Sequence, residues 1–402
     1  MTDKWLMCVF VRSMSGSVVG RRVLWLQVLG LASVQGAIAL TWVIYNLYLE
    51  DLLVTLGFSA ALATTLLIVE NAMGAVMEPL MGSFSDQRQH WVGSRFPQIA
   101  LGLILAAVCF LGIPLVFLVG SSVKSLLPVI LVTWALAMTV FRSPALSLLG
   151  RYAFEADLPQ AASVLTMVGG VTGAMAPLAS DFILGMGALA AFSIGTTVLL
   201  LAALVLRQVH PNQTVSTSPS STGANARMPW ANLPWIVGTG AGVALGLRLL
   251  LTSFPTAVAA TGFSQPKLMM AALFLTVAVS ALPCGQLATR LGNRVAMLLG
   301  LGGMVAATGI TNVMATSGIA MFVAIAIGIA FSLIGNGTLP YALSMVPPTK
   351  AGLGTGLYFS GGAMAMSLLG SFGTSLSDGQ ALLVAAIGFI AAAGCILVKQ
   401  PS

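Results

Sequence analysis

The sequence predicts an all-α integral membrane protein with twelve transmembrane helices in two six-helix bundles and with both termini in the cytoplasm. Of its 402 residues, 58% are hydrophobic and only 7% are charged. A soluble globular domain carries roughly 25% charged residues. This chain therefore cannot cover a water-facing surface, and its outer solvent must be lipid. We expect a multi-pass protein of the cell (inner) membrane.

Apolar runs long enough to cross a bilayer follow one another along the chain. A hydrocarbon core about 30 Å thick requires roughly 20 apolar residues in a helix. A polar stretch rich in Ser and Thr divides these runs into two sets of six and has the composition of a flexible linker. We therefore divide the chain into a cytoplasmic N-terminal tail (1–22), an N-terminal six-helix bundle (23–206), a cytoplasmic linker (207–231) and a C-terminal six-helix bundle (232–402). The expected spans are 24–48, 58–83, 96–119, 127–149, 160–183, 186–206, 232–256, 267–288, 295–314, 317–344, 352–375 and 379–397.

The positions of lysine and arginine support this topology. With both termini in the cytoplasm, thirteen of the 17 Lys and Arg residues lie on the cytoplasmic side, Lys124 and Lys267 lie on the other side, and Arg142 and Arg248 lie within spans. Cytoplasmic loops of membrane proteins are enriched in Lys and Arg. Because topology accounts for the net charge of +7, we expect no nucleic-acid partner.

Sequence patterns typical of enzymes and of ATP-driven pumps are missing. The chain contains no Gly-x-x-x-x-Gly-Lys-Ser/Thr phosphate loop and no His-Glu-x-x-His pair, and its two histidines lie far apart in loops. Its four cysteines have no metal-ligand spacing and are typical of small buried apolar side chains. We expect a protein that is not an enzyme and that holds no cofactor and no metal.

The two halves contain short matching segments. Pro144–Ser147 in the fourth span matches Pro340–Ser344 in the tenth, and the pair Gly169-Gly170 in the fifth matches Gly361-Gly362 in the eleventh. Parallel repeats of this kind place a solute site at the interface between the two halves. The pattern favours such a site here.

Three segments of the first half carry a family resemblance. Met77–Asp86 lies at the end of the second expected span, Gly93–Pro97 follows it, and Arg142–Leu149 ends the fourth. Together with the linker and the six-plus-six plan, they resemble the major facilitator superfamily, and within it the glycoside–pentoside–hexuronide and sucrose–proton symporters. Arg95 stands alone where that group has three basic residues. The resemblance implies a monomeric secondary transporter that moves a sugar-like solute by alternating access, coupled to a proton or another cation.

Four charged residues fall inside expected spans: Glu70 and Glu78 in the second, Arg142 in the fourth and Arg248 in the seventh. A charge at a helix centre costs about 2.5–3.5 kcal/mol on insertion scales, so such residues usually face a partner or a water-filled cavity. Either glutamate can carry a coupling proton, and Arg142 can bind an anionic group. Asn71 shares a helix face with Glu78. The alternatives are a structural ion pair of a glutamate with Arg142, a contact of Glu78 with basic loop residues, and an Arg248 that snorkels to the interface.

The first span carries a polar and aromatic face. Trp42, Tyr45 and Asn46 have i, i+3, i+4 spacing, and Gln35 joins the same face seven residues before Trp42. An aromatic ring beside an amide suits stacking on, and hydrogen bonding to, a polar ring such as a sugar. The alternative is an aromatic belt at the membrane interface.

The tenth span contains Asn336 and Tyr341 close to the helix breakers Gly337 and Pro340. Irregular backbone at membrane depth is tolerated where it lines a cavity. We expect a locally bent helix that presents these two side chains to the solute path.

A charged cluster follows the second span. The family resemblance implies that Asp86, Arg88 and Arg95 act as a gate that pairs with helix ends and stabilises the outward-open state. Arg290 ends the corresponding eighth span, and we include it in the gating set. The alternative is that the basic residues serve membrane orientation alone.

Three hypotheses follow for function. The first is a secondary transporter with a small-molecule substrate, a coupling proton or cation and the lipid bilayer as partners. The second is a non-transporting assembly or pigment-delivery factor of the same superfamily, which needs no polar cavity. The third is an exporter of amphipathic compounds, which needs a wider and more apolar one. Convergence of Glu70, Arg142, Arg248 and Asn336 on one water-filled site distinguishes the first hypothesis from the second.

Overall fold

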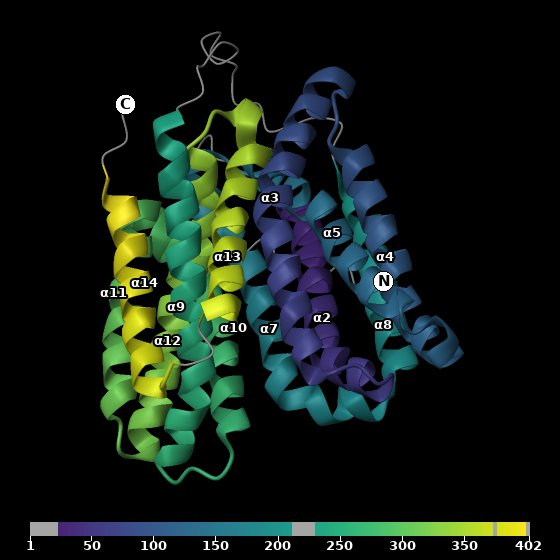
Figure 1. The fold of residues 1–402 in the computed structure, drawn as a ribbon. Helices are drawn as coiled ribbons and strands as arrows, with labels where there is room; N and C mark the ends of the chain where they lie inside the picture. The colour runs from purple at the N-terminus through teal and green to yellow at the C-terminus, as the bar shows by residue number, and fades with distance from the viewer. Residues whose placement is uncertain (1–22, 211–229, 373–375, 399–402) are drawn as a thin grey trace, which may run out of the picture.

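The computed structural model describes residues 23–210, 230–372 and 376–398, and these segments are helical apart from short connections (Figure 1). The expected N-terminal tail (1–22) and most of the expected linker (207–231) lie outside the described residues. The first six long helices are α2 (Trp25–Thr55), α3 (Ala60–Val92), α4 (Phe96–Val119), α5 (Leu126–Leu146), α7 (Leu158–Gly185) and α8 (Ala188–Val209). The single turn α6 (Leu149–Tyr152) follows α5.

Six more long helices form the second half of the chain. They are α9 (Leu233–Ala260), α10 (Pro266–Leu291), α11 (Asn293–Val313), α12 (Ser317–Ser344), α13 (Ala351–Phe372) and α14 (Asp378–Leu397). Short 3₁₀ turns lie at Ser121–Val123, Glu155–Asp157, Trp230–Asn232 and Pro348–Lys350.

Proline and glycine set several helix ends. Pro97 and Pro159 lie in the first turns of α4 and α7, where proline suits the helix because its missing N–H has no intrahelical partner to lose. Gly93 ends α3 with φ 75°, and Gly120 ends α4 with φ 84°. Residues with a Cβ rarely adopt this left-handed backbone, so glycine terminates these helices at low cost.

Eleven of the described helices are long and apolar enough to cross a membrane. The twelfth long helix, α13, has 22 residues, several of them Gly and Ser, and is not among the eleven. The expected twelve spans therefore correspond to twelve long helices, of which eleven have the composition of a span. The cytoplasmic location of the termini stays a prediction.

Each half has its own apolar core. One cluster of buried side chains runs from Val28 to Leu206, with Leu339 added from the second half, and another runs from Ile236 to Ile396. The outer faces are apolar as well. On α4, for example, Leu101, Ile104 and Val108 are exposed by 56–65%. Such exposed apolar stripes are expected where lipid is the surrounding solvent.

The two halves meet most extensively along two helix pairs, α3 with α13 and α7 with α10. In Figure 1, α3 and α13 lie side by side at the centre of the molecule. The absence of a side chain permits this approach, because a Cβ on Gly82 would overlap the backbone carbonyl of Gly352. Small residues at a helix crossing allow close backbone contact within a membrane.

This contact generates a test of the helix crossing. We expect Gly82→Val to lower the stability of the purified protein by about 1–3 kcal/mol, the usual cost of overpacking, because the new side chain must separate α3 from α13. Thermal unfolding in detergent measures the effect. Gly302→Val in α11 is the matched control, since a Cβ there meets no atom within 4 Å. Equal melting temperatures for the two variants would contradict the close crossing.

Candidate functional site

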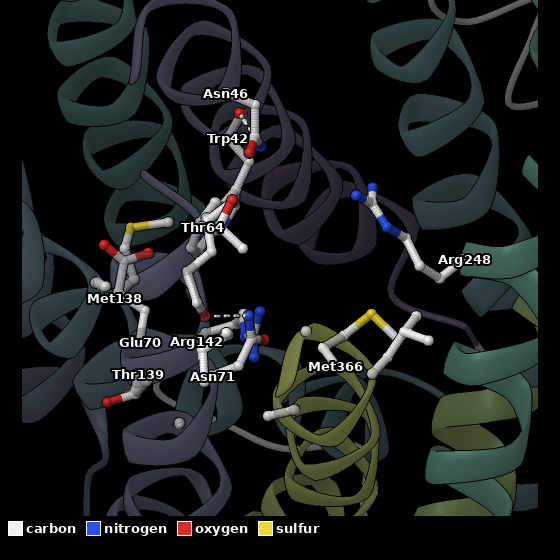
Figure 2. Close-up of a pocket in the computed structure, with 17 residues that line it drawn as sticks. Trp42, Asn46, Thr64, Glu70, Asn71, Met138, Thr139, Arg142, Arg248 and Met366 are labelled. Carbon is white, nitrogen blue, oxygen red and sulfur yellow. Dashed lines mark hydrogen bonds between the residues drawn. The ribbon is translucent and has the colours of Figure 1, made fainter. Parts of the chain in front are cut away.

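A polar cavity of about 390 Å³ lies between the two halves of the molecule. Helices α2, α3 and α5 line it from the first half, and α9 and α13 line it from the second (Figure 2). Six residues singled out in the sequence contribute to its lining: Trp42, Asn46, Glu70, Asn71, Arg142 and Arg248.

The cavity extends away from the end of the molecule that contains Asp86. Thr64 lines the cavity near the start of α3, whereas Asp86 lies near the end of the same helix. Their separation of 22 positions in the sequence corresponds to roughly 33 Å at the rise of an α-helix. Thr64, Asn46 and Arg248 are exposed, so the cavity is accessible at the end opposite to Asp86.

Glu70 is a nearly buried carboxyl, 6% exposed. The hydroxyl of Tyr45 donates a hydrogen bond to its Oε1, whereas Oε2 is buried and has no hydrogen-bond partner among the described residues. Tyr45 is itself fixed, because its ring is fully buried and lies 4.5 Å from the ring of Trp134. No ion pair involves Glu70 within the described chain, so one carboxyl oxygen at the cavity has unused hydrogen-bonding capacity.

Arg142 is held between the two halves. Its Nη2 forms an ion pair with Oε1 of the fully buried Glu78, and the hydroxyl of Ser143 donates to the other carboxylate oxygen. The guanidinium carbon of Arg142 lies 4.7 Å from the ring centroid of Phe359 on α13, a cation–π distance. The sequence is compatible with an ion pair of Arg142 with either Glu70 or Glu78. Among the described residues, this ion pair forms with Glu78, and no ion pair joins Glu78 to a loop arginine.

Arg248 enters the cavity from α9, across from the helices of the first half (Figure 2). Its side chain is exposed, and it has no ion pair with any acidic residue that the structure describes. The charge of Arg142 is compensated by Glu78, but the charge of Arg248 is not. The second half thus presents an unpaired guanidinium to the cavity.

Trp42 and Asn46 lie together at the cavity wall. The Nδ2 of Asn46 donates to the backbone carbonyl of Trp42 at 2.7 Å, and the indole Nε1 of Trp42 is buried without a partner among the described residues. The indole also contacts the rings of Tyr45 and Trp134. It therefore belongs to the aromatic interior of the first bundle and not to an outer belt.

Five of the candidate solute-site residues lie outside this cavity, among them Tyr45 and Glu78, which contact Glu70 and Arg142 of its lining. Gln35 lines a separate cavity deeper in the molecule. The amide of Asn336 is fully buried and donates to the backbone carbonyl of Ala281 at 2.8 Å. Tyr341 accepts a hydrogen bond from the Thr239 hydroxyl at 3.2 Å. The expected convergence therefore includes Glu70, Arg142 and Arg248 but not Asn336, because helix contacts within the second half occupy that amide.

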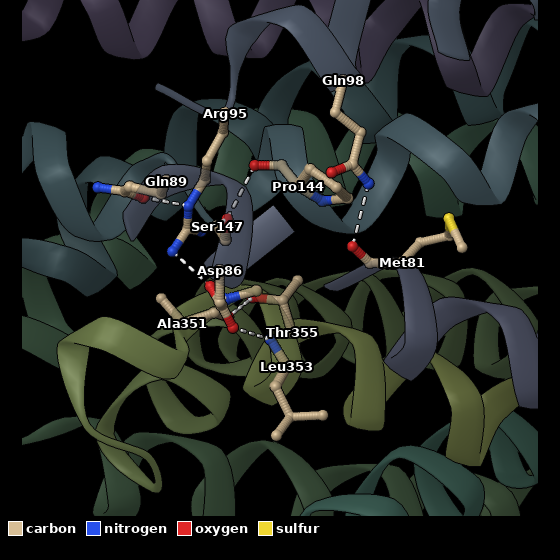
Figure 3. A network of polar contacts seen from close by, with 11 residues as sticks. Met81, Asp86, Gln89, Arg95, Gln98, Pro144, Ser147, Ala351, Leu353 and Thr355 are labelled. Carbon is tan, nitrogen blue, oxygen red and sulfur yellow. Dashed lines mark hydrogen bonds and ion pairs between the residues drawn. The ribbon is translucent and has the colours of Figure 1, made fainter. Parts of the chain in front are cut away.

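A buried polar network lies at the end of α3 (Figure 3). Asp86 accepts from Nη2 of Arg95 at 2.5 Å and from the backbone amides of Gly352 and Leu353 at 2.9 Å each. Those amides belong to the first turn of α13, where N–H groups have no intrahelical partner and attract negative charge. Burial lowers the pKa of Arg95, and the carboxylate of Asp86 opposes that shift. The network therefore ties the two halves together at this end.

Arg95 extends the network within the first half. Its other nitrogens donate to the Ser147 hydroxyl and to the side-chain carbonyl of Gln89. The other members of the expected gating set are not part of it. Arg88 lies over the ring of Phe84 at 5.3 Å, and Arg290 is exposed in the last turn of α10, with no ion pair to either one in the described segments.

Sequence analysis did not single out several residues of these two sites. Ser147 lies within the segment that carries the family resemblance, which is a usable signal. Phe359 has no such signal in the sequence, because single aromatic residues are common in apolar helices. Gly352 and Leu353 act through backbone amides, which have no side-chain signature.

The helical fold and the cavity between its two halves are typical of membrane transporters. The sequence model of the Major Facilitator Superfamily matches residues 31–371, so the chain belongs to this superfamily. It is accordingly a multi-pass integral membrane protein. No curated protein matches the chain.

Two solved structures are similar in fold. Both are of a bacterial homologue of the iron transporter ferroportin in an outward-facing state, one of them with soaked iron. Their TM-scores are 0.71 for the iron-soaked structure and 0.68 for the other, and in both cases the identity is 14% with 92% of this chain and 98% of the other covered. At this identity the likeness shows the fold alone. The comparisons support the superfamily and leave the resemblance to sugar symporters as a prediction.

The Asp86 network generates a test by double-mutant cycle. We expect Asp86→Ala and Arg95→Ala each to lower stability by about 3–5 kcal/mol, because each leaves a buried charge unpaired. The double variant should be less destabilised than the sum of the two, since residues in one network are coupled. Thermal unfolding measures all three, with Arg88→Ala as the control outside the network. Strict additivity would show that the pair does not act as a unit.

Proposed function

We propose that this protein is a secondary active transporter that moves a small polar solute across the membrane by alternating access, with the polar cavity as its solute site. One observation carries the proposal: charged side chains from both halves, Glu70 and Arg142 from one and Arg248 from the other, line a single cavity. A solute that contacts both halves links its own binding to their relative position. Because charged side chains are costly in hydrocarbon, their presence at this depth supports a water-filled cavity.

The distribution of Lys and Arg supports a cytoplasmic position for the end that contains Asp86. In that orientation the described conformation is open to the outside and closed to the cytoplasm. Asp86 and Arg95 then form the cytoplasmic gate, and the remaining members of the expected set, Arg88 and Arg290, serve orientation. We propose a monomer in the cell membrane.

Glu70 is the stronger candidate for coupling to a proton or another cation. The buried carboxylate of Glu78 already has the counter-charge of Arg142, whereas Glu70 has only the Tyr45 hydroxyl. A buried carboxyl without a cation partner favours uptake of a proton or a cation. Asn71, next to it on the cavity wall, adds a polar group for the solute or the ion.

The lining supports a polar organic solute, sugar-like in the simplest case. Trp42 offers a ring for stacking and Asn46 an amide beside it. The similar solved structures are of an iron transporter homologue. Iron requires several oxygen, nitrogen or sulfur ligands, and the described residues contain no group of three or more His, Cys, Asp or Glu that would hold a metal ion. We therefore favour the organic solute.

An exporter of amphipathic compounds is the second candidate. An apolar cavity of about 540 Å³ lies between α9, α13 and α14, and Leu369 lines both this cavity and the polar one. An amphipathic compound can place its polar part near Arg248 and its apolar part beyond Leu369. The assembly-factor hypothesis is less favoured, because it gives no role to the charges in the polar cavity.

Uptake into proteoliposomes tests the coupling role. With a panel of sugars and an imposed pH gradient, we expect Glu70→Gln to abolish the pH-dependent part of uptake, because the amide cannot exchange a proton. Glu50→Gln, at an exposed position on α2, is the matched control and should retain it. Uptake that is unchanged in Glu70→Gln would remove this residue from coupling.

Substitution of Arg248 tests the solute site. We expect Arg248→Gln to raise KM by roughly 10-fold to 100-fold, since a hydrogen bond from a charged group contributes about 1.5–3 kcal/mol. Arg248→Lys should recover part of the loss, because it keeps the charge but not the planar fork. Arg207→Gln, exposed at the end of α8, is the control. A KM that is equal in all variants would place the solute elsewhere.

A further inference from the structure

A second cavity of about 300 Å³ lies between the halves and is lined by Phe359, the aromatic residue that Arg142 contacts. Helices α2, α5 and α7 line it from the first half and α10, α12 and α13 from the second. We call it the inner cavity, and we call the polar cavity around Glu70 the outer cavity. The residues of the inner cavity used below are Gln35, Thr166, Thr338 and Phe359.

The inner cavity lies toward the Asp86 end of the molecule. Leu146, the last residue of α5, lines it, and its neighbour Ser147 contacts the Arg95 of the Asp86 network. Ala162, in the first turns of α7, lines it too. The outer cavity instead reaches Thr64 near the opposite end. The outer cavity therefore reaches further toward the end opposite to Asp86, and the inner cavity reaches further toward the Asp86 end.

The contact between Arg142 and Phe359 lies where the two cavities adjoin. Arg142 lines the outer cavity and Phe359 lines the inner one, and the guanidinium carbon lies 4.7 Å from the ring centroid. Glu78 anchors Arg142 in the first half, whereas Phe359 belongs to the second. Because each half supplies one side of this contact, relative motion of the halves changes it directly.

The inner cavity presents hydrogen-bond acceptors. The Oε1 of Gln35 is buried and has no donor among the described residues. The hydroxyl of Thr166 donates to the Ala162 carbonyl at 3.3 Å, and that of Thr338 donates to the Gly335 carbonyl at 3.0 Å, so both hydroxyl oxygens retain acceptor capacity.

No charged residue contributes to the described lining of the inner cavity. A cationic donor would therefore lose its hydration without a counter-charge, which is costly. Uncharged donors such as hydroxyl groups meet no such cost and satisfy the free acceptor of Gln35. The two cavities thus differ in chemistry, with guanidinium donors in the outer one and neutral acceptors in the inner one.

We propose that the inner cavity is a second solute subsite that binds uncharged hydroxyl groups, and that the stack of Arg142 on Phe359 is the gate between the two subsites. This inference rests on the proposed function, in which the solute passes between the halves. The gate is held shut in the described conformation, and the solute crosses it as the halves rearrange.

Cysteine labelling tests the gate without any solute. The background carries serine in place of Cys8, Cys109, Cys284 and Cys395, and Thr338→Cys reports on the inner cavity. A membrane-impermeant thiol reagent is added from the side on which the outer cavity opens. We expect slow labelling, because a minor open state is typically about 0.1–10% populated. Adding Phe359→Ala should raise the labelling rate at least about tenfold, since the barrier is then permanently open.

Two controls make the result specific. Asn46→Cys in the outer cavity should be labelled at the same fast rate with and without Phe359→Ala. Met364→Ala, on the same helix but with an exposed side chain outside both cavities, should leave the labelling of Thr338→Cys unchanged. Phe359→Leu, which keeps a large apolar side chain, should raise the labelling rate less than Phe359→Ala does. If Thr338→Cys is labelled as fast as Asn46→Cys while Phe359 is intact, or if Phe359→Ala leaves its labelling slow, the gate assignment is wrong.

Protection from labelling tests the ligand class. In the Phe359→Ala background, mannitol and sucrose should slow the labelling of Thr338→Cys, whereas choline and acetate at equal concentration should not. Gln35→Leu should remove this protection and leave the unprotected rate unchanged. Protection by an ion alone, or by none of the four, would overturn the assignment of neutral hydroxyl groups. These measurements require no transport, so the two proposals can fail separately. If Phe359→Ala does not raise the labelling rate while uptake by the unchanged protein is normal, the gate assignment is wrong. If the labelling results are as expected but the protein takes up no solute, the proposed transport function is wrong.

Discussion

An ionised side chain costs several kcal/mol in hydrocarbon, and the arrangement of the interface between the halves follows from how this cost is met. Asp86 is offset by Arg95 and by two backbone amides of α13. Glu78 is offset by Arg142. Glu70 and Arg248 have no ionic partner among the described residues, and both face the outer cavity. Water or solute in that cavity must therefore compensate the charges of Glu70 and Arg248, as protein groups compensate the charges of Asp86 and Glu78.

The same contacts that offset charge also connect the halves at different depths. Asp86 reaches α13 at the closed end, and Arg142 reaches Phe359 between the two cavities. At the other end, Lys267 and Asp181 lie 3.4 Å apart, but both side chains are more than 60% exposed. Exposed pairs of this kind contribute little, about 0–1 kcal/mol. The charge-assisted links between the halves thus lie toward the Asp86 end, whereas the cavity is accessible from the opposite one.

Sequence reasoning located the helices and the charges but not the contacts that organise them. Apolar run length decides where a helix crosses, and a charge within such a run is visible in the sequence, so Glu70, Arg142 and Arg248 could be found. Gln35 shares a helix face with Trp42 but lies about 10 Å deeper, seven residues at the helix rise, and this depth assigns it to another cavity. Asn336 could not be placed, because only the packing of α12 on α10 decides that its amide meets Ala281. The partners of Asp86 are backbone amides more than 260 positions away in the sequence, and no local pattern identifies them.

Alternating access requires that the links at the closed end be strong enough to hold one state and weak enough to be exchanged. A two-state protein typically differs by a few kcal/mol between its states. The Asp86 network supplies a few charge-assisted hydrogen bonds, each worth about 1.5–3 kcal/mol at most, and the α13 amides become available to water when it opens. A solute can shift such a balance only by its difference in affinity for the two states. Because Arg248 belongs to one half and Glu70 to the other, a solute that contacts both has an affinity that depends on the separation of the halves, and in the proposed mechanism this dependence converts binding into movement.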